Sequence, residues 1–490
     1  MIDREGYRAV WLGAVLLLAW VSYGDVAGRG LYADDFVFGW LAETHTYAEA
    51  VAYWHREVPA GGRLLLAAIT PVVYGTFSSP ELLESRFGAF HAFLVVIHLA
   101  NTVLLWGLAW RYRLGPVASG VTALVFLLHP AKDRAVLWPA AAYGYAIPLL
   151  LFLVGWHCLH GAAPRGRGRL LAGYVLWAVA ALAIEQFVVV AAALLVWWTI
   201  TGYRRGEGVR ARVAGLAVIA GLFLAVHFLL GGATEERLAS YEARNAGGQH
   251  GVGYLVEATK IVVWRLNPLP FHSAHEEAWR LARHGSGHPI LLGGLGAAMA
   301  GFCLWSWPAP TARGNGGRAV AEGVVVAVAA LMPFLLLGMG AGPPRGMLLA
   351  MVGLALVAGG LVEMVLSWGR WGAVARATVA ALAALFACAA TVANAGYQVG
   401  YRQVWGLERG VLREVAKRTW QEGDRVVVEG LPKGPLVAQL FEDSWGLYHA
   451  LRWITHLDDI DGWTRRMHEA RPASAAGRLI TLHAPGPEPD

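Results

Sequence analysis

Two adjacent carboxylates, Asp34 and Asp35, follow the first apolar stretch of the chain, in the segment LYADDFVFGW at residues 31–40. Because an ionised carboxylate at a membrane border is costly to desolvate, acidic residues there usually serve a function. A carboxylate pair has the chemistry to take a proton from a hydroxyl group or to bind a divalent cation. The alternative is a solvated loop whose first aspartate caps a short helix.

Further polar groups stand where other apolar stretches begin or end. They are Arg63, His129, Lys132, Asp133, Arg134, Glu185 with Gln186, and Arg345. Individually, border arginines can extend to lipid headgroups, and charged loop residues are usually solvated. Together, an acid pair and several cations match transfer from a phosphate-linked donor. A base removes the acceptor's proton, and cations stabilise the departing phosphate, which arginine can bind with two parallel hydrogen bonds.

The elements that must position these groups are membrane-spanning helices. The chain has 490 residues, 57% of them hydrophobic, with a mean hydropathy of +0.47. Apolar runs of about 18–22 residues recur without a period of two, which indicates helices rather than a barrel. We therefore predict an all-α polytopic membrane protein with about eleven transmembrane helices. The predicted spans are 9–24, 87–110, 115–130, 143–161, 170–185, 187–201, 213–231, 288–306, 320–340, 346–367 and 376–394.

The basic residues predict the orientation of these spans. They gather in short connections that all fall on one side: Arg111 with Arg113, Arg165–Arg169, Arg204–Arg212, Arg313–Arg318 and Arg370–Arg376. The positive-inside rule then places the N-terminus in the cytoplasm and, with an odd number of spans, the C-terminus outside. The formal net charge of +6 is thus a topology signal and does not indicate a nucleic-acid partner. We expect a multi-pass protein of the cytoplasmic (inner) membrane.

Most residues with catalytic potential fall on the opposite, external side. We divide the chain into a transmembrane domain, 1–394, and an extracytoplasmic C-terminal domain, 395–490. The first contains an external loop, 31–86, with an interfacial helix at Thr44–Val58, and a long external loop, 232–287. The second has a helical stretch near Leu407–Trp420, strand patterns at Arg425–Glu429 and Arg478–Leu482, and a helix between the strands, which predicts a small α/β appendage.

An ordered set of motifs resembles the GT-C superfamily of polytopic glycosyltransferases, especially the protein O-mannosyltransferase and tetratricopeptide-linked O-mannosyltransferase type. The set runs along most of the membrane part and is densest over residues 31–186. It comprises Asp34-Asp35-Phe36, Arg63, His98-Leu-Ala-Asn101-Thr-Val-Leu-Leu105, Leu128-His129-Pro130 with Ala135-Val136, Glu185-Gln186, Arg345 and Val427–Pro432.

The resemblance implies an inverting glycosyltransferase that moves a sugar from a polyprenyl-phosphate donor to an acceptor hydroxyl on the extracytoplasmic face. Asp34 or Asp35 would be the base, with Asp35 also a candidate orienting partner. Arg345, Lys132 and Arg63 would contact the donor phosphate. Other candidates for the site are Asp133, Arg134, Glu185 and His129. The expected partners are the lipid-linked sugar, membrane lipid, and a lipid, polysaccharide or protein acceptor.

The sequence leaves open rival functions and the need for a metal. A transporter or flippase of lipid-linked sugar, or a non-catalytic membrane assembly protein, would share much of this pattern. Polar residues collected at one rim favour surface chemistry, since transporters keep theirs near the bilayer middle. A divalent metal is compatible with adjacent aspartates, but the sequence lacks further carboxylates to complete an oxygen shell, so we expect no required cofactor or metal. His91 and His98 are expected to be packed, hydrogen-bonded side chains.

Overall fold

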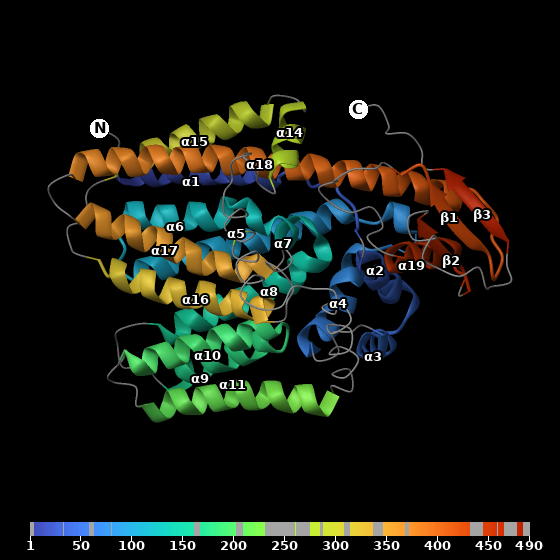
Figure 1. Cartoon of the computed structure of the whole chain (residues 1–490), viewed down its shortest axis with the longest axis horizontal. Coiled ribbons are helices and arrows are strands. Elements are labelled where there is room, and N and C mark those ends of the chain that lie inside the picture. The colour runs from blue at the N-terminus through green and yellow to red at the C-terminus, as the bar shows by residue number, and fades with distance from the viewer. Residues whose placement is uncertain are drawn as a thin grey trace.

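The computed structural model describes residues 4–32, 34–57, 63–79, 81–160, 167–201, 209–230, 260, 275–284, 288–307, 314–336, 346–367, 372–431, 444–457, 459–464 and 478–483. Long helices with roughly parallel axes form a bundle, and the N-terminus lies at the end of the bundle far from a small sheet (Figure 1). The predicted loop 232–287 lies outside the described residues except for Lys260 and 275–284.

Each of the eleven predicted spans coincides with a helix, so the expected fold class is confirmed. Among the described residues, six helices are long and apolar enough to cross a membrane, and six more are shorter and apolar. The helices that match the predicted spans are α1 (Arg4–Tyr23), α5 (Phe87–Arg111), α6 (Pro116–Leu128), α8 (Pro139–Leu159), α9 (Arg167–Ala181), α10 (Glu185–Ile200), α11 (Val209–Leu230), α15 (His288–Ser306), α16 (Gly316–Leu336), α17 (Met347–Ser367) and α18 (Gly372–Ala416).

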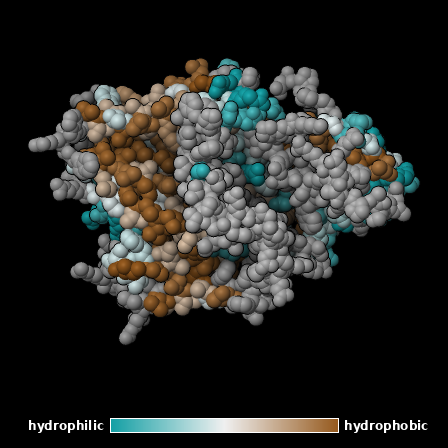
Figure 2. All heavy atoms as spheres, in the orientation of Figure 1, coloured by the Kyte–Doolittle hydropathy of each residue, from teal (hydrophilic) through white to brown (hydrophobic). Residues whose placement is uncertain are grey.

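The surface of the bundle has the composition of a lipid-facing belt. Large apolar side chains are widely exposed on these helices, for example Trp20, Val103, Leu171, Leu291 and Leu382. Figure 2 shows hydrophobic residues gathered over the bundle, with hydrophilic residues at its edges and toward the sheet. A contiguous apolar surface of this kind is unfavourable in water and is satisfied by hydrocarbon.

A ladder of small residues joins α16 and α17, which run antiparallel. A Cβ added at Gly316 would lie 2.7 Å from the carbonyl oxygen of Gly360, and one added at Gly323 would lie 2.6 Å from that of Gly353. The spacing is seven residues on both helices, so the small residues stay on one seam and the backbones approach closely. We call these contacts the glycine ladder.

Four helices lie beyond the spans at one end of the bundle (Figure 1). They are α2 (Asp34–Thr44), α3 (Tyr47–Glu57), α4 (Leu64–Phe77) and the short α7 (Arg134–Leu137), with the 3₁₀ turns η1 (Leu82–Glu84) and η2 (Pro130–Lys132) nearby in sequence. α3 confirms the predicted helix at 44–58, and Trp54 on its buried face packs against Phe38 of α2 with ring centroids 4.7 Å apart. α4 is an apolar helix that the predicted spans do not include.

The C-terminal part differs from the expected two-domain division in one respect. α18 is a single helix of 45 residues that passes through the expected boundary after Asn394 without a break. Its second half buries Tyr401, Val404 and Trp405, so packing against the rest of the protein continues the helix beyond the expected boundary. α14 (Glu276–His284), which falls within the predicted loop 232–287, packs its Ala278 against α18.

The appendage itself is the predicted small α/β unit. It has a parallel sheet in the order β2-β1-β3, made of β1 (Arg425–Glu429), β2 (Asp461–Thr464) and β3 (Leu479–His483), with α19 (Ser444–Thr455) between β1 and β2. β1 is the central strand and is buried along Val426–Val428. β2 carries no β-branched run and was not expected from the sequence.

Candidate functional site

Asp35 is a buried carboxylate at the start of α2 and is fully engaged by the protein. Its Oδ2 accepts a hydrogen bond from the backbone N–H of Tyr32 at 2.8 Å, which satisfies a donor at the helix start as in a capping box. Its Oδ1 accepts bonds from the Ala140 N–H at 2.6 Å and from the Tyr74 hydroxyl. Burial raises the pKa of the Asp35 carboxyl well above its usual value, and the three hydrogen bonds oppose that rise.

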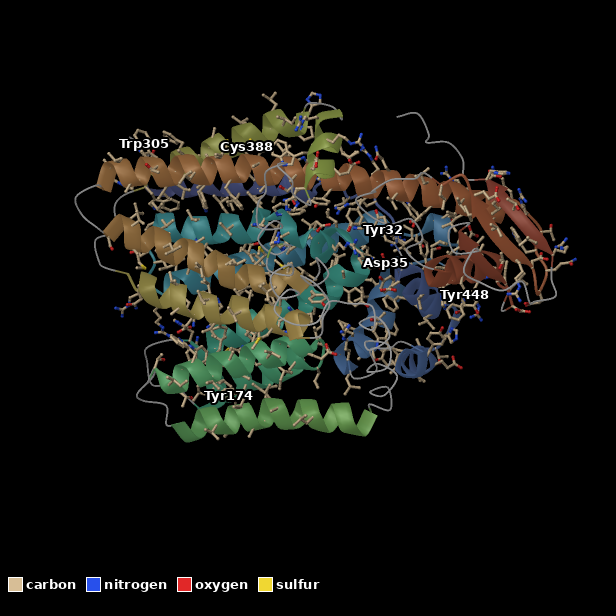
Figure 3. The ribbon with its side chains drawn as sticks, viewed as in Figure 1. Tyr32, Asp35, Tyr174, Trp305, Cys388 and Tyr448 are labelled. Carbon is tan, nitrogen blue, oxygen red and sulfur yellow. The ribbon has the colours of Figure 1, made fainter. Side chains whose placement is uncertain are left out.

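These bonds tie three elements together at one point. Tyr74 comes from α4 and Ala140 from the first turn of α8, so the Asp35 carboxylate joins α2, α4 and α8. Trp138 adds a bond from its indole N–H to the Tyr32 carbonyl at 3.0 Å. Figure 3 shows Asp35 and Tyr32 at the end of the bundle, with the appendage beyond them. The Asp35 carboxylate therefore holds the start of α2 against α4 and α8.

Asp34 differs from its neighbour in exposure, although both belong to the first turn of α2. Its side chain is half-buried, whereas that of Asp35 is inaccessible. The N-terminus of a helix favours negative charge, so an ionised Asp34 is stabilised there without being removed from solvent. Of the two predicted candidates, Asp34 has the side chain that is more exposed to solvent.

A second cluster brings together two more predicted residues, Arg63 and Glu185. Arg63 Nη2 lies 3.2 Å from Glu185 Oε2, and the two side chains keep 27% and 33% of their exposure. The α4 backbone supports this contact, because the Leu65 N–H donates to the Leu182 carbonyl at 3.3 Å. The start of α4 and the α9–α10 turn therefore meet at a partly exposed ion pair.

Gln186 connects this cluster to the glycine ladder. Its Nε2 donates to the carbonyl of Ala330 at 2.5 Å and to that of Gly346 at 3.0 Å. Ala330 and Gly346 continue the seven-residue spacing of the ladder, so Gln186 bridges its next rung. The predicted phosphate contact Arg345 is adjacent to Gly346 in sequence but lies outside the described residues.

The loop after α6 places Lys132 among protein groups. Its side chain is fully buried, and Nζ donates to the Tyr23 hydroxyl and to the Leu127 carbonyl, each at 3.0 Å. Burial lowers the pKa of this ammonium to about 7, while the charge of Asp133 opposes the shift. Lys132 therefore contributes to the packing of α1 against α6.

The neighbours of Lys132 shape the same loop. His129 Nδ1 accepts a hydrogen bond from the Ala131 N–H at 3.2 Å and caps η2. Asp133 is buried, and its carbonyl accepts from the Val136 N–H at 3.0 Å as α7 begins. Arg134 is half-buried, with its guanidinium 5.9 Å from the Trp138 ring.

Several residues of this region were not found by sequence reasoning. Tyr74 and Tyr143 lie in apolar helices and gave no charge or motif signal. In the structure, Tyr74 bonds Asp35, and the Tyr143 hydroxyl lies 2.6 Å from Thr70 Oγ1. The available signal was a hydroxyl-bearing side chain inside an apolar run, because such a group usually has a hydrogen-bond partner when buried.

Histidines, as possible metal ligands, and an apolar cavity lie within the described part of the chain. Within the described ranges, no three His, Cys, Asp or Glu side chains lie close enough together to hold a metal ion. His91 and His98 each place Nε2 close to a backbone carbonyl, at 3.0 Å from Gly30 and 3.1 Å from Leu127. An apolar cavity of about 180 Å³ lies between α6, α17 and α18, away from the acid pair.

Comparisons with known proteins add little. No family model and no curated protein matches the chain. Among solved structures, it is similar to ArnT from Cupriavidus metallidurans bound to undecaprenyl phosphate, with a TM-score of 0.43 and 17% identity over 94% of this chain and 86% of that one. The apo state of the same protein gives a TM-score of 0.39 and 16% identity over the same shares. Likenesses at this level define neither the family nor the function of the chain.

Proposed function

We propose that the protein is an inverting glycosyltransferase that transfers a sugar from a polyprenyl-phosphate donor to an acceptor hydroxyl, with Asp34 as the base. The observation that carries the proposal is the division between the two aspartates. Asp35 is buried and held by three donors, and Asp34 beside it is accessible at a helix N-terminus. A fixed carboxylate that supports an accessible one is an arrangement suited to general-base catalysis.

In the proposed step, the Asp34 carboxylate takes the proton of the acceptor hydroxyl as its oxygen attacks the anomeric carbon. The new carbon–oxygen bond forms opposite the bond to phosphate, which breaks and leaves its electron pair on the polyprenyl phosphate. Because the attack and the departure occur on opposite faces, the configuration at the anomeric carbon inverts. Asp35 keeps α2, and with it Asp34, fixed relative to α4 and α8.

Cationic residues would stabilise the departing phosphate. Arg63 is the described candidate, since its guanidinium is partly exposed and is oriented by Glu185. The sequence resemblance assigns Arg345 to the same role. We do not extend this role to Lys132, because its ammonium is buried and already donates to two protein oxygens. Asp133, Arg134 and His129 would support the adjoining loop.

The proposed orientation follows from charge. The described basic residues Arg111, Arg169, Arg318 and Arg376 lie at or near the helix ends opposite α2. The positive-inside rule then places those ends in the cytoplasm and the acid pair on the extracytoplasmic face. The lipid phosphate of a membrane-embedded donor would thus meet Asp34 and Arg63 at the outer border of the bilayer.

The test uses the purified full-length protein in lipid nanodiscs with radiolabelled polyprenyl-phosphate sugars and a membrane extract as the acceptor source. We expect label to move from lipid to acceptor with wild-type protein and at least a hundredfold more slowly with Asp34→Asn. Undiminished transfer by Asp34→Asn would refute the role of Asp34. Movement of intact labelled lipid between leaflets of proteoliposomes without transfer would instead identify a flippase.

A further inference from the structure

Helix α19 of the appendage lies directly against α2, the helix that begins with the acid pair. Trp453 is fully buried, and its six-membered ring covers Gly39 so closely that a Cβ at Gly39 would overlap ring atoms. Glycine is unfavourable inside a helix, so this contact accounts for its presence in the middle of α2. The ring of Trp453 occupies the space that any larger side chain at position 39 would need.

Two further contacts surround this one. The Arg452 guanidinium stacks over the Trp40 ring at 4.3 Å, a distance at which a cation is attracted to an aromatic face. His449 is fully buried, and its Nε2 lies 3.2 Å from the hydroxyl of Tyr53 on α3. α19 therefore contacts α2 at Gly39 and Trp40, and it contacts α3 at Tyr53. Figure 3 places Tyr448, which also belongs to α19, farther from the bundle than Asp35.

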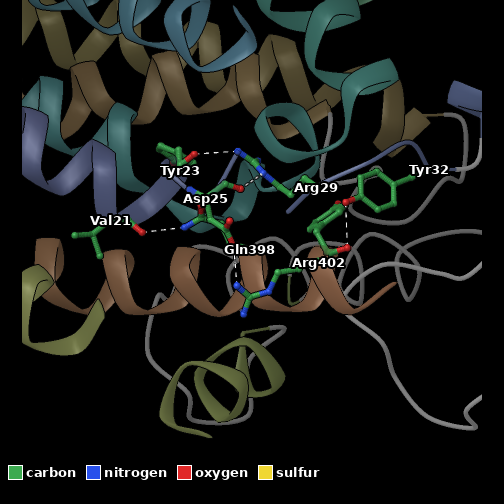
Figure 4. A network of polar contacts seen from close by, with 8 residues as sticks. Val21, Tyr23, Asp25, Arg29, Tyr32, Gln398 and Arg402 are labelled. Carbon is green, nitrogen blue, oxygen red and sulfur yellow. Dashed lines mark hydrogen bonds and ion pairs between the residues drawn. The ribbon is translucent and has the colours of Figure 1, made fainter. Parts of the chain in front are cut away.

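The segment that leads into α2 is bound by α18 (Figure 4). Gln398 accepts a hydrogen bond from the Asp25 N–H at 2.9 Å and donates to the Val21 carbonyl at 2.8 Å. The Tyr32 hydroxyl donates to the Tyr401 carbonyl at 3.0 Å. The C-terminal part of the chain thus holds the acidic segment both before and after Asp34.

We propose that Trp453 is a positioning residue for Asp34, and this inference rests on the proposed role of Asp34 as the base. Gly39 follows Asp34 by five residues, or roughly 7.5 Å along the helix axis. A helix moves as a rigid element over that distance, so the Trp453–Gly39 contact sets the depth and rotation of α2. Catalysis is sensitive to displacements of about 1 Å at the reacting groups, which gives a remote contact influence over rate.

The first test changes the fit between the two residues. Gly39→Ala adds the methyl group for which the ring leaves no space, and we expect kcat for sugar transfer to fall at least tenfold. KM for the lipid-linked donor should stay within twofold, since donor contacts are made by other elements. Trp453→Leu in the Gly39→Ala background removes the overlapping ring atoms, and the added methyl group then fills part of the vacated space, so this double variant should restore part of the lost rate. Gly406→Ala on α18, where a Cβ meets nothing within 4 Å, is the matched control and should leave kcat unchanged.

The second test needs no activity. Hydrogen exchange of the α2 amides in nanodiscs should be at least tenfold faster in Trp453→Leu than in wild type, with the α5 amides unchanged. Unchanged α2 exchange in this variant would overturn the proposal, as would a wild-type kcat in Gly39→Ala or a loss that Trp453→Leu does not relieve. If wild-type protein transfers no sugar, the proposed function fails, and the exchange measurement still decides whether Trp453 holds α2.

Discussion

Asp34→Asn and Asp35→Asn make the same chemical change at adjacent positions, and the structure predicts opposite consequences. Asp35→Asn should lower stability, because the carboxylate of Asp35 accepts from Tyr32, Tyr74 and Ala140. Asp34→Asn should leave stability nearly intact and abolish transfer. The two variants therefore separate the positioning carboxylate from the proposed base.

The size of the stability effect follows from the donors around Asp35. Asparagine keeps one acceptor oxygen, and its NH₂ group cannot accept a hydrogen bond. In Asp35→Asn this NH₂ group must face either the Tyr32 N–H or the pair formed by the Ala140 N–H and the Tyr74 hydroxyl, so at least one bond is lost. A hydrogen bond to a charged group contributes about 1.5–3 kcal/mol, and bonds to a neutral acceptor are about half as strong. Losing one bond and weakening two others gives a cost of roughly 3–6 kcal/mol. At Asp34 the change removes a favourable helix-end charge, which contributes about 0.3–1 kcal/mol.

Both quantities can be measured on protein purified in detergent. Thermal unfolding followed by tryptophan fluorescence should show a drop of several degrees for Asp35→Asn and little change for Asp34→Asn. Transfer by Asp34→Asn, measured below its unfolding temperature, should be about 10²–10⁴-fold slower than wild type. Glu43→Gln on the same helix is the control and should alter neither property. Equal stability of the two variants, or faster transfer by Asp34→Asn than by Asp35→Asn, would refute the assignment.

Three further predictions concern other parts of the structure. In the folded protein the pKa of Lys132 is lowered to about 7, whereas in the unfolded chain it is about 10.5. Between these two pH values the folded state binds fewer protons at Lys132 than the unfolded chain does. The free energy of unfolding of wild type should therefore rise across that window, by at most roughly 5 kcal/mol. Lys132→Met should lack this rise, so the unfolding temperature of wild type should increase relative to that of Lys132→Met as pH increases; a difference that does not change with pH would contradict the burial of the charge. A double-mutant cycle of Arg63→Ala and Glu185→Ala, read by unfolding temperature, should give a coupling of about 0.2–1 kcal/mol, as for other partly exposed pairs. Gly353→Val should prevent accumulation of folded protein in size-exclusion chromatography, since a Cβ there overlaps the Gly323 carbonyl; a monodisperse variant would argue against the glycine ladder.

The sequence was sufficient to predict the positions of the spanning helices, because a helix that crosses a bilayer must be both long and apolar, and both properties are visible in the sequence. It was insufficient for the end of α18. Beyond Asn394 the hydropathy falls, and what continues the helix is the burial of residues such as Tyr401 and Trp405 against distant parts of the chain. Periodicity within a segment does not reveal which remote surface will cover it.

The sequence singled out the acid pair as a candidate site, but it did not predict the different environments of its two members. Asp34 and Asp35 are equivalent in sequence, and only Tyr74 and Ala140, 39 and 105 residues away from Asp35, distinguish them. Lys132 shows the same limit. A charged residue in a connecting loop suggests an accessible cation, whereas the oxygens of Tyr23 and Leu127 draw it into the protein.

Gly346, just before α17, and Gly353 and Gly360 within it recur every seven residues. The number of residues between them therefore matters as much as the residue types. One residue deleted between Gly353 and Gly360 would turn the remainder of the helix by about 100°. Leu361 would then take the place of Gly360 opposite Gly316, and its side chain would face that backbone. Homologues of this chain should therefore vary freely in the lipid-facing side chains of α16 and α17, and should accept insertions or deletions there only in multiples of seven residues made in both helices together.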